Sequence, residues 1–322
     1  MAEAWRGTGV AVVGCGHWGR NLARNFAGLG ALAAVVDPEP AAAEAQGKAH
    51  GVPAMTFDAA LSADGVHAVA IAAPAERHAE IAVAASRAGR HVFVEKPIAL
   101  SRADGEAMRD AARDAGRTLM VGHLLQYHPA FLALWEQVAG GAIGKPLQAT
   151  SIRLSMGRLR TEEDVLWSFA PHDVSMLLAL AGEPPSRIGA TGRALVSHDL
   201  ADEARLELAF PSGFTAHAHL SWLSPFKRQQ LVVTGETGSI VLDDTEPWER
   251  KLVVTSHAVV DGPALRKGAP EPVALEAAEP LRAECMHFLE CCAGLHPPRT
   301  DADEALRVLD VLVAASDAMD LR

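Results

Sequence analysis

The sequence has few aromatic side chains and no long basic run. Only 5% of its 322 residues are Phe, Trp or Tyr, and Tyr127 is the single tyrosine. A surface on which bases stack would have to be built from very few rings. The net charge is −11, and Lys and Arg are not clustered as binding to a phosphate backbone requires. We therefore expect no nucleic-acid partner.

Cysteine is also scarce. The four cysteines stand at positions 15, 285, 291 and 292, and no two of them form a Cys-x-x-Cys pair. The histidines show neither the His-x-x-x-His nor the His-Glu-x-x-His spacing of common zinc sites. The sequence therefore predicts reduced, buried thiols, no disulfide framework and no metal site.

Long apolar runs are missing as well. No stretch reaches the roughly 18 continuous apolar residues of a membrane span. The first ten residues lack the basic-then-apolar order of a signal peptide. We expect a cytoplasmic protein with no membrane partner. An apolar content of 49% is typical of globular chains, and the length fits two domains.

The first part of the chain alternates apolar runs with helical patterns. Such runs are expected as strands at 10–13, 31–36, 66–73, 91–94 and 118–121. Because these runs are continuously apolar, they are typical of a parallel sheet buried on both faces. The pattern predicts a doubly wound Rossmann domain over residues 1–122.

After residue 122 the pattern changes. Helices are expected at 129–139 and 174–180, and strands at 147–154, 204–210, 214–222, 229–234, 239–242 and 251–257. Short turns between consecutive strands predict a large, mostly antiparallel open sheet in an α/β domain over residues 123–322. Residues 261–278, rich in Gly and Pro, are expected as a surface loop. The last two helices are expected at 279–293 and 301–321, the second capped by Thr300. The last helix can pack back on the first domain.

A glycine fingerprint follows the first predicted strand. Gly14, Gly16 and Gly19 match Gly-x-Gly-x-x-Gly, with His17 and Trp18 between the last two glycines. In a strand-turn-helix unit Gly14 permits the tight turn, Gly16 lets the backbone approach a pyrophosphate, and Gly19 lets the helix pack on the strand. Free N–H groups and the helix dipole then bind the phosphates. This predicts a dinucleotide site.

Asp37 indicates which dinucleotide, NAD or NADP, this site binds. It stands 23 residues after Gly14, at the end of the second predicted strand. A carboxylate at this point binds the adenosine ribose hydroxyls and repels a 2′-phosphate. Pro38 and Glu39 offer no positive charge to such a phosphate, so the sequence predicts NAD rather than NADP.

Two residues are candidates for catalysis. Lys96, in Glu95-Lys96-Pro97, follows a predicted parallel strand and so faces the ligand crevice, where an ammonium group polarises a substrate oxygen. On spacing alone, a lone lysine is more often a surface charge. His172 has the pKa range for proton transfer near neutrality, but among 14 histidines a structural role stays open. Asp173 either orients this histidine or caps the helix.

Taken together, these motifs resemble the Gfo/Idh/MocA family of nicotinamide-dependent sugar and cyclitol oxidoreductases. The resemblance implies a second domain whose sheet shields the active site on one face and packs against another subunit on the other, giving a homo-oligomer (dimer or tetramer). It implies that NAD is bound by Gly14, Gly16, His17, Trp18, Gly19, Asp37, Ala73, Pro74, His78, Glu95 and Lys96.

Two family roles carry over by position. Lys96 matches the lysine that holds the reacting hydroxyl, and His172 matches the histidine of an Asp-x-x-x-His pattern. The aspartate of that pattern falls on Ser168, which is a departure. The proton must then leave through His172, Lys96 or a relay.

The middle segments resemble the branch that oxidises UDP-N-acetylhexosamines at C3, with UDP-N-acetylglucosamine as the expected substrate. Segments 122–129 and 166–173 and the pair Ser221-Trp222 carry this likeness. Arg153, Arg158 and Arg160 could meet a diphosphate, or could form a solvated loop. Expected substrate-binding residues are His123, Tyr127, Arg153, Arg160, Trp167, His172 and Asp173. Open alternatives are another sugar, a uronic acid or a cyclitol as substrate, a hydro-lyase or glycosidase that reuses bound NAD, and a non-catalytic NAD-binding regulator.

Overall fold

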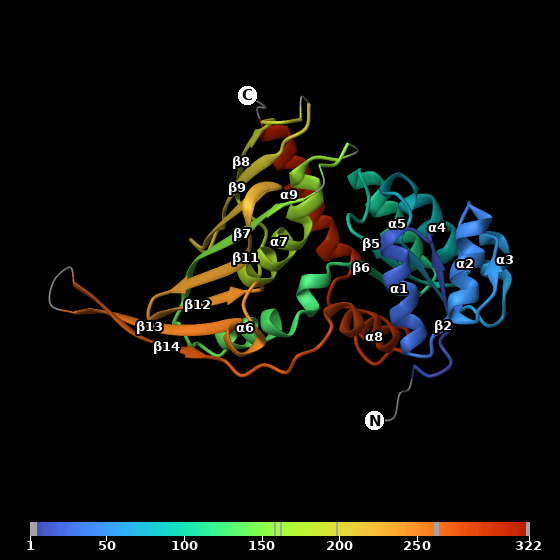
Figure 1. Cartoon of the computed structure of the whole chain (residues 1–322), viewed down its shortest axis with the longest axis horizontal. Coiled ribbons are helices and arrows are strands. Elements are labelled where there is room, and N and C mark those ends of the chain that lie inside the picture. The colour runs from blue at the N-terminus through green and yellow to red at the C-terminus, as the bar shows by residue number, and fades with distance from the viewer. Residues whose placement is uncertain (1–4, 158, 162, 198, 261–263, 320–322) are drawn as a thin grey trace. The chain divides into compact units, whose positions relative to one another are not determined.

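The computed structural model describes residues 5–157, 159–161, 163–197, 199–260 and 264–319. The chain divides into two compact units (Figure 1). The first comprises Met1–Leu124 and Glu279–Leu309, and the second Leu125–Ala278 and Asp310–Arg322. The predicted domain limits of 1–122 and 123–322 stay a prediction, and the two units are described in turn.

The first unit is built on a six-stranded parallel sheet. The strands lie side by side in the order β3-β2-β1-β4-β5-β6. The chain therefore adds strands outward from β1 to one edge of the sheet and then from β4 to the other edge. β1 and β4 are buried along their whole length, as a sheet covered on both faces requires. The strands are β1 (Val10–Val13), β2 (Leu32–Val36), β3 (Ala54–Met55), β4 (Ala68–Ile71), β5 (His91–Glu95) and β6 (Leu119–Gly122). The predicted doubly wound Rossmann sheet is confirmed.

Helices α1 (His17–Gly28), α2 (Pro40–His50), α3 (Phe57–Ser62), α4 (His78–Arg87) and α5 (Arg102–Asp114) connect these strands, with the short η1 (Ala75–Arg77) before α4. A later helix, α8 (Pro280–Cys292), completes the core of this unit. Its Phe288 packs edge-on against Phe26 of α1 and Phe93 of β5, with ring centroids 6.3 and 5.7 Å apart. The buried surface of α1 and β5 is thus covered by a segment far along the chain.

The second unit contains an eight-stranded sheet of order β14-β13-β12-β11-β7-β10-β9-β8, in which only β7 and β10 run parallel. Helices α6 (Pro129–Ala139) and α7 (Val165–Ala181) pack on it. The strands are β7 (Pro146–Met156), β8 (Arg187–Arg193), β9 (Glu203–Ala209), β10 (Thr215–Ser221), β11 (Leu223–Gly235), β12 (Gly238–Asp243), β13 (Leu252–Val260) and β14 (Ala264–Pro272); η2 (Leu124–Tyr127) and η3 (Trp248–Arg250) are single turns. The predicted mostly antiparallel sheet is confirmed.

The prediction of a surface loop at 261–278 is wrong for much of that stretch. β14 pairs antiparallel with β13, with Pro270 opposite Thr255 and Pro272 opposite Val253. Proline lacks the N–H of a central strand, but β14 is an edge strand, where one side of the backbone has no partner strand to bond. Residues 261–263 lie outside the described part of the chain.

Two helix starts also differ from prediction. α7 begins at Val165 rather than 174, because the Asp164 carboxylate accepts the N–H of Trp167 at 3.0 Å and caps the first turn. Pro171 lies inside this helix, whose extensive burial outweighs one missing hydrogen bond. Thr300 does not cap α9 (Ala302–Ala318), since its hydroxyl donates to the Val121 carbonyl; Asp301 accepts the N–H of Glu304 instead.

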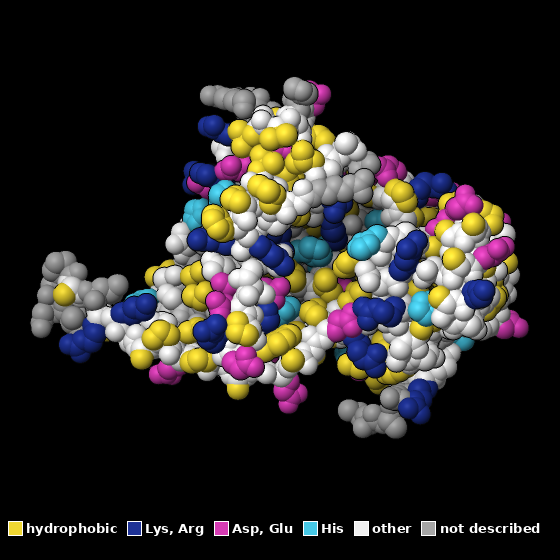
Figure 2. Space-filling view, viewed as in Figure 1, with side chains coloured by type: hydrophobic (Ala, Val, Ile, Leu, Met, Phe, Trp, Pro, Cys, Tyr) yellow, Lys and Arg dark blue, Asp and Glu magenta, His cyan; other side chains and the backbone are white. Residues whose placement is uncertain are grey.

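No helix in the described residues is both long enough and apolar enough to cross a bilayer. On the face seen in Figure 2, acidic and basic side chains are interspersed rather than gathered by sign. This distribution gives no support on that face to a nucleic-acid footprint.

Candidate active site

The glycine turn after β1 has the geometry of a phosphate cradle. Gly14 has φ +97°, and a Cβ there would meet the Ala72 carbonyl oxygen at 2.6 Å. A Cβ on Gly19 would overlap the Gly14 carbonyl, so the start of α1 packs directly on the turn. Gly16 is exposed, with open space where a Cβ would stand, and no side chain caps the first turn of α1. The N-terminal N–H groups of α1 can therefore meet an anionic ligand.

Asp37 is fixed beside this turn at the end of β2. Its Oδ2 accepts the N–H of Cys15 at 2.6 Å, and its Oδ1 accepts the N–H of Glu39 at 2.9 Å. Each carboxylate oxygen keeps a further lone pair, so ribose hydroxyls can still donate to it. The cradle and the carboxylate together fit the diphosphate and ribose of a dinucleotide. His17 is exposed and Trp18 half-buried at the start of α1.

His78 ties two loops together at the carboxyl edge of the sheet. Its Nε2 lies 2.9 Å from the Ala73 carbonyl and its Nδ1 lies 2.9 Å from the Pro97 carbonyl. The side chain is buried, and this burial lowers its pKa. A neutral imidazole donates to only one carbonyl at a time. His78 therefore joins the loop after β4, with Ala73 and Pro74, to the turn that carries Lys96, and does not itself face a ligand.

Lys96 stands half-buried directly after β5, and the Lys96–Pro97 peptide bond is cis. Glu95 before it is buried, and this burial raises its pKa to about 7, against the opposing influence of the Trp18 side chain and the Lys96 charge. Glu284 of α8 is also buried, and its pKa is raised well above the usual range by burial and by the charge of Glu95. The lysine thus adjoins a pair of interacting buried carboxyl groups.

Sequence reasoning missed Glu284. It stands one helical turn before Phe288, on the face of α8 that also buries Leu281 and Cys285. A carboxylate on the apolar face of a helix is the signal that could have marked it, because such groups are rarely buried without a reason.

His123, expected to bind substrate, is buried in the first unit. Its Nδ1 lies 2.7 Å from Oε2 of Glu304 in α9. This contact fixes the ring and leaves Nε2 as the nitrogen that remains for a ligand. Glu304 was not anticipated from the sequence, since it lies 181 residues further along the chain.

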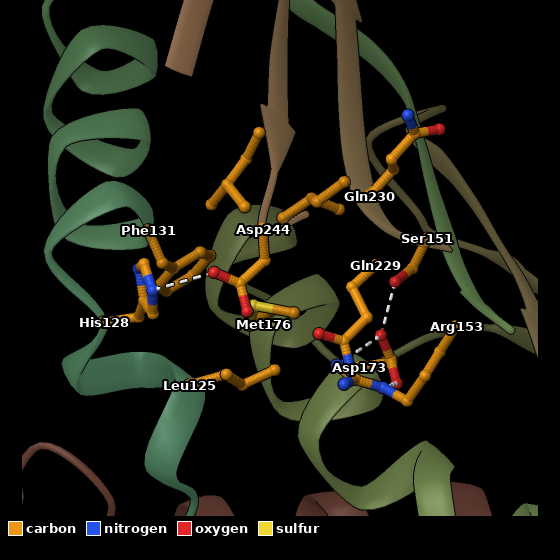
Figure 3. A pocket seen from close by; sticks show the side chains of 12 residues that line it. Leu125, His128, Phe131, Ser151, Arg153, Asp173, Met176, Gln229, Gln230 and Asp244 are labelled. Atoms are coloured by element: carbon orange, nitrogen blue, oxygen red, sulfur yellow. Dashed lines mark hydrogen bonds and ion pairs between the residues drawn. The ribbon is translucent and has the colours of Figure 1, made fainter. Parts of the chain in front are cut away.

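In the second unit α7 carries His172, and the next residue, Asp173, is fully buried. The Asp173 carboxylate accepts the Ser151 hydroxyl at 2.5 Å and the Arg153 guanidinium at 2.6 and 3.2 Å (Figure 3). The structure therefore commits Asp173 and Arg153 to each other, and neither presents its charge freely to a substrate. Their evident role is to fix the helical turn of His172 on β7.

A cavity of about 30 Å³ lies beside this ion pair (Figure 3). It has room for a water molecule or two and is far too small for a nucleotide sugar. His128 Nε2 lies 3.3 Å from Oδ1 of Asp244 at its other side. Its lining is Leu125, His128, Phe131, Ser151, Arg153, Asp173, Met176, Gln229, Gln230, Leu231, Leu242 and Asp244. This hollow is part of the packing under the sheet and not the substrate site.

The other predicted substrate residues are spread through the second unit. Tyr127 is buried, and Trp167 is half-buried in the first turn of α7. Arg160 is exposed and pairs with Glu163 at 2.5 Å, while Arg158 lies outside the described residues. Trp222, marked by the sequence, donates its indole N–H to Asp202 at 2.8 Å and is buried. Ser168 is buried one helical turn before His172.

Comparison with known families identifies both halves of the chain. Residues 8–123 match the model of the oxidoreductase family with an NAD-binding Rossmann fold, and residues 131–241 match the Gfo/Idh/MocA C-terminal domain. Together these matches cover most of the sequence.

Individual relatives support this. The chain is 29% identical to UDP-N-acetylglucosamine 3-dehydrogenase of Acidithiobacillus ferrooxidans, and the match covers 93% of each chain. A solved structure of that enzyme superposes on this chain with a TM-score of 0.85 at 27% identity, and this match covers 96% of this chain and 97% of the other. It is 25% identical to scyllo-inositol 2-dehydrogenase (NAD(+)) of Bacillus subtilis over 96% and 93% of the two chains. This chain therefore belongs to the Gfo/Idh/MocA oxidoreductases, a family of NAD-dependent sugar and cyclitol dehydrogenases, and carries their NAD-binding Rossmann domain.

Proposed function

We propose that this protein oxidises the C3 hydroxyl of UDP-N-acetylglucosamine to a 3-keto sugar with NAD as the oxidant. In this proposal residues 1–122 bind the cofactor and residues 123–322 bind the sugar nucleotide in a cytoplasmic enzyme. One observation carries the choice: the similarity to a UDP-N-acetylglucosamine 3-dehydrogenase runs through both domains and includes nearly all of either chain.

Oxidation of the alcohol removes a proton from oxygen and a hydride from carbon. NAD, when bound, supplies the nicotinamide ring that accepts the hydride. Lys96 donates a hydrogen bond to the reacting oxygen, and its ammonium charge stabilises the negative charge that develops there as the proton leaves. Its half-buried position after β5 strengthens this interaction, because water screens it less than at an open surface.

His172 accepts the hydroxyl proton. An imidazole titrates near neutral pH, so it can take the proton and later release it to solvent. Ser168 stands where the family pattern has a carboxylate, so in this proposal the base that accepts the hydroxyl proton is His172. The alternative is that the proton leaves through Lys96 or through a relay. The Arg153–Asp173 pair holds the turn of α7 from which His172 extends.

The cofactor side rests on the residues around α1. Gly14, Gly16 and Gly19 would hold the diphosphate against the helix N-terminus, and Asp37 would accept hydrogen bonds from the ribose. The negative charge of Asp37 disfavours a 2′-phosphate, which supports NAD over NADP.

The test uses the purified full-length chain, UDP-N-acetylglucosamine and NAD, with NADH absorbance as the readout. A PLP-dependent aminotransferase with its amino donor removes the ketone if the equilibrium is unfavourable. We expect NADH formation, with NADP at least tenfold less effective. Lys96→Met should reduce turnover by 10²-fold or more with NAD affinity nearly unchanged, and the exposed Lys48→Met is the matched control. No turnover in the coupled assay would exclude this substrate.

A cyclitol or unphosphorylated sugar is the second candidate. It is favoured by one observation: Arg153 and Arg160, the expected partners of the diphosphate, are both engaged in ion pairs. A thermal-shift series with NAD present compares UDP-N-acetylglucosamine, its uronic acid form, myo-inositol and glucose. The compound that raises Tm most and also yields NADH identifies the substrate. NAD binding without turnover on any of them would favour a regulatory NAD-binding protein.

A homo-oligomer is also part of this proposal. On the side of the sheet opposite to the buried Ala149, Leu231 and Ile240, the alternate residues Ile152, Val232 and Val241 are only half-buried. An apolar face of this kind favours association of two copies, as a dimer or within a tetramer. Light scattering that shows a fully active monomer would contradict it.

A further inference from the structure

Three potential metal ligands converge near the end of α8. His287 and Cys291 stand four residues apart, so they share one face of the helix, and His296 follows shortly after the helix ends. One ligand atom from each of the three lies within 4.8 Å of the other two. The Rossmann chemistry described above uses none of them.

The separation of these atoms fits one small ion. Cys291 Sγ lies 3.4 Å from His296 Nδ1. With Zn–S of about 2.3 Å and Zn–N of about 2.0 Å, two ligands of a tetrahedral zinc ion lie roughly 3.5 Å apart. The His287 and His296 rings are stacked with centroids 4.5 Å apart and planes inclined by 19°, which sets them side by side at the thiol.

A neighbouring carboxylate orients His296 for this role. Oε2 of Glu290 lies 3.1 Å from Nε2 of His296. When Nε2 carries the hydrogen and donates to Glu290, Nδ1 keeps its lone pair and points it toward the Cys291 sulfur. A carboxylate behind the ligating imidazole is the usual outer support of a zinc-bound histidine.

His287 is held by the segment that follows α8. The backbone N–H of Arg299 donates to His287 Nε2 at 3.0 Å. Ligation through this nitrogen would exchange that hydrogen bond for a bond to the metal. The chain from Cys291 to Arg299 would then be linked to the helix through an ion rather than through a hydrogen bond alone.

The cluster is within reach of solvent. Cys291 itself is buried, but it contributes to the wall of a cleft of about 620 Å³, and the His296 side chain is 37% exposed. An ion can enter from the cleft, and a water molecule can complete its coordination.

We propose that His287, Cys291 and His296 form a binding site for Zn²⁺ or a chemically similar divalent transition metal. The metal takes the place of the thiol proton: the S–H bond breaks, an S–Zn bond forms, and the proton is released to solvent. The mixed thiolate and imidazole set favours zinc and cobalt over magnesium or calcium, which prefer oxygen ligands. The site fastens the segment after α8 to the helix.

The test is titration of the chelator-treated full-length chain with Co²⁺, followed by displacement with Zn²⁺. A cobalt–thiolate pair gives a charge-transfer absorption that oxygen and nitrogen ligands do not. We expect this band to saturate at one cobalt per chain and to disappear on addition of zinc. In Cys291→Ser the band should vanish, and in His296→Asn the affinity should fall at least tenfold. Cys292→Ser, which changes the adjacent thiol outside the cluster, is the matched control and should keep both the charge-transfer band and the metal affinity.

A second readout, the melting temperature, distinguishes loss of metal binding from misfolding of a variant. Zn²⁺ should raise the Tm of the parent chain and of Cys292→Ser but not of Cys291→Ser or His296→Asn. Glu290→Gln should weaken binding by about tenfold while keeping the charge-transfer band. Absence of the band in the parent chain, or a band that survives in Cys291→Ser and is lost in Cys292→Ser, would overturn the proposal.

Discussion

The part-buried Arg153 of β7 and the buried Asp173 of α7 form an ion pair with two hydrogen bonds, 2.6 Å from Nε to Oδ2 and 3.2 Å from Nη2 to Oδ1. Ser151 donates to the same carboxylate, so two residues of one strand hold a single position of the helix. Because Asp173 follows His172 directly, these contacts limit where the imidazole can move.

Removing the charge of Asp173 should therefore affect both stability and catalysis. Asp173→Asn leaves the part-buried Arg153 guanidinium without its counter-charge, and we expect a loss of about 3 kcal/mol in the free energy of unfolding. In the fraction that stays folded, kcat should fall by about tenfold or more with a smaller change in KM. Urea unfolding and steady-state kinetics measure the two effects.

Glu163→Gln is the matched control, because it removes a carboxylate from the exposed pair with Arg160. Surface pairs contribute about 1 kcal/mol at most, so this variant should stay close to the parent chain. Equal losses in both variants would contradict the positioning role of Asp173.

The pair Glu95 and Glu284 should make stability fall as pH rises. Both carboxyl groups hold their protons more tightly when folded than when unfolded, and the pKa of Glu95 is about 7 against an ordinary 4.5. Between pH 4.5 and about 7 the folded state therefore binds more protons, and stability decreases with pH. Glu284→Gln removes one of the two charges and should raise Tm at pH 8 while changing it little at pH 5.

Thermal unfolding from pH 5 to 8 checks this, with the exposed Glu44→Gln as control. Because burial raises the pKa of Glu284 well above the usual range, removing its carboxyl group should flatten the pH profile of stability. A parallel profile in Glu284→Gln would show that folding does not raise the pKa of Glu284.

Asp202 should have the opposite effect on the pH dependence of stability, at acidic pH. Its buried carboxylate accepts N–H groups of Leu195, Val196 and Ser197 and the indole N–H of Trp222. Burial alone would raise its pKa, but these hydrogen bonds outweigh burial and lower the pKa to about 2. The stability that it contributes is complete above pH 3.8 and is lost as the pH falls toward 2.

Asp202→Asn should therefore cost roughly 2–4 kcal/mol near neutral pH and make acid unfolding less steep. The exposed Asp199→Asn, in the same loop, should change neither quantity. Circular dichroism followed from pH 6 to 2 compares the variants, and a parent-like curve for Asp202→Asn would disprove the assignment.

Asp37 should decide between the two nicotinamide cofactors. Asp37→Ser removes the carboxylate that meets the ribose, so NAD affinity should fall by about tenfold, and NADP, no longer repelled, should bind better than in the parent chain. Fluorescence titration with each reduced cofactor measures both. Unchanged NAD affinity would show that Asp37 only supports the glycine turn through the Cys15 N–H.

The Rossmann half was predictable because its signals are local. The five expected strands are apolar runs, and the fingerprint from Gly14 to Gly19 combines turn, phosphate approach and helix packing within one short segment. The two-residue β3 was not expected, because it is too short to give such a run. β14 was missed because its prolines weaken any strand signal, and only the sheet order reveals that it lies at an edge. The start of α7 was placed too late because Pro171 is read as a break, whereas burial on the sheet carries the helix through it.

The candidate site was predictable only in part. Lys96 and Asp37 follow strands, so their positions depend on the fold class alone. The partners of Asp173 and of Glu95 depend on how a strand and a helix distant in sequence are aligned, which composition and spacing do not contain. Glu284 and Glu304 lie on α8 and α9, more than 150 residues after the strands they adjoin, and no local pattern joins them.

The prolines of β14 have a consequence for how copies of this chain can meet. An open sheet edge usually offers a row of N–H and C=O groups to which another strand can add, and this is a common route to misassembly. The Val273 N–H donates to the Leu252 carbonyl, so the nitrogens of Pro272 and Pro270 face away from β13 and leave two positions on the outward side without a donor. Strand addition along this stretch of β14 is therefore disfavoured.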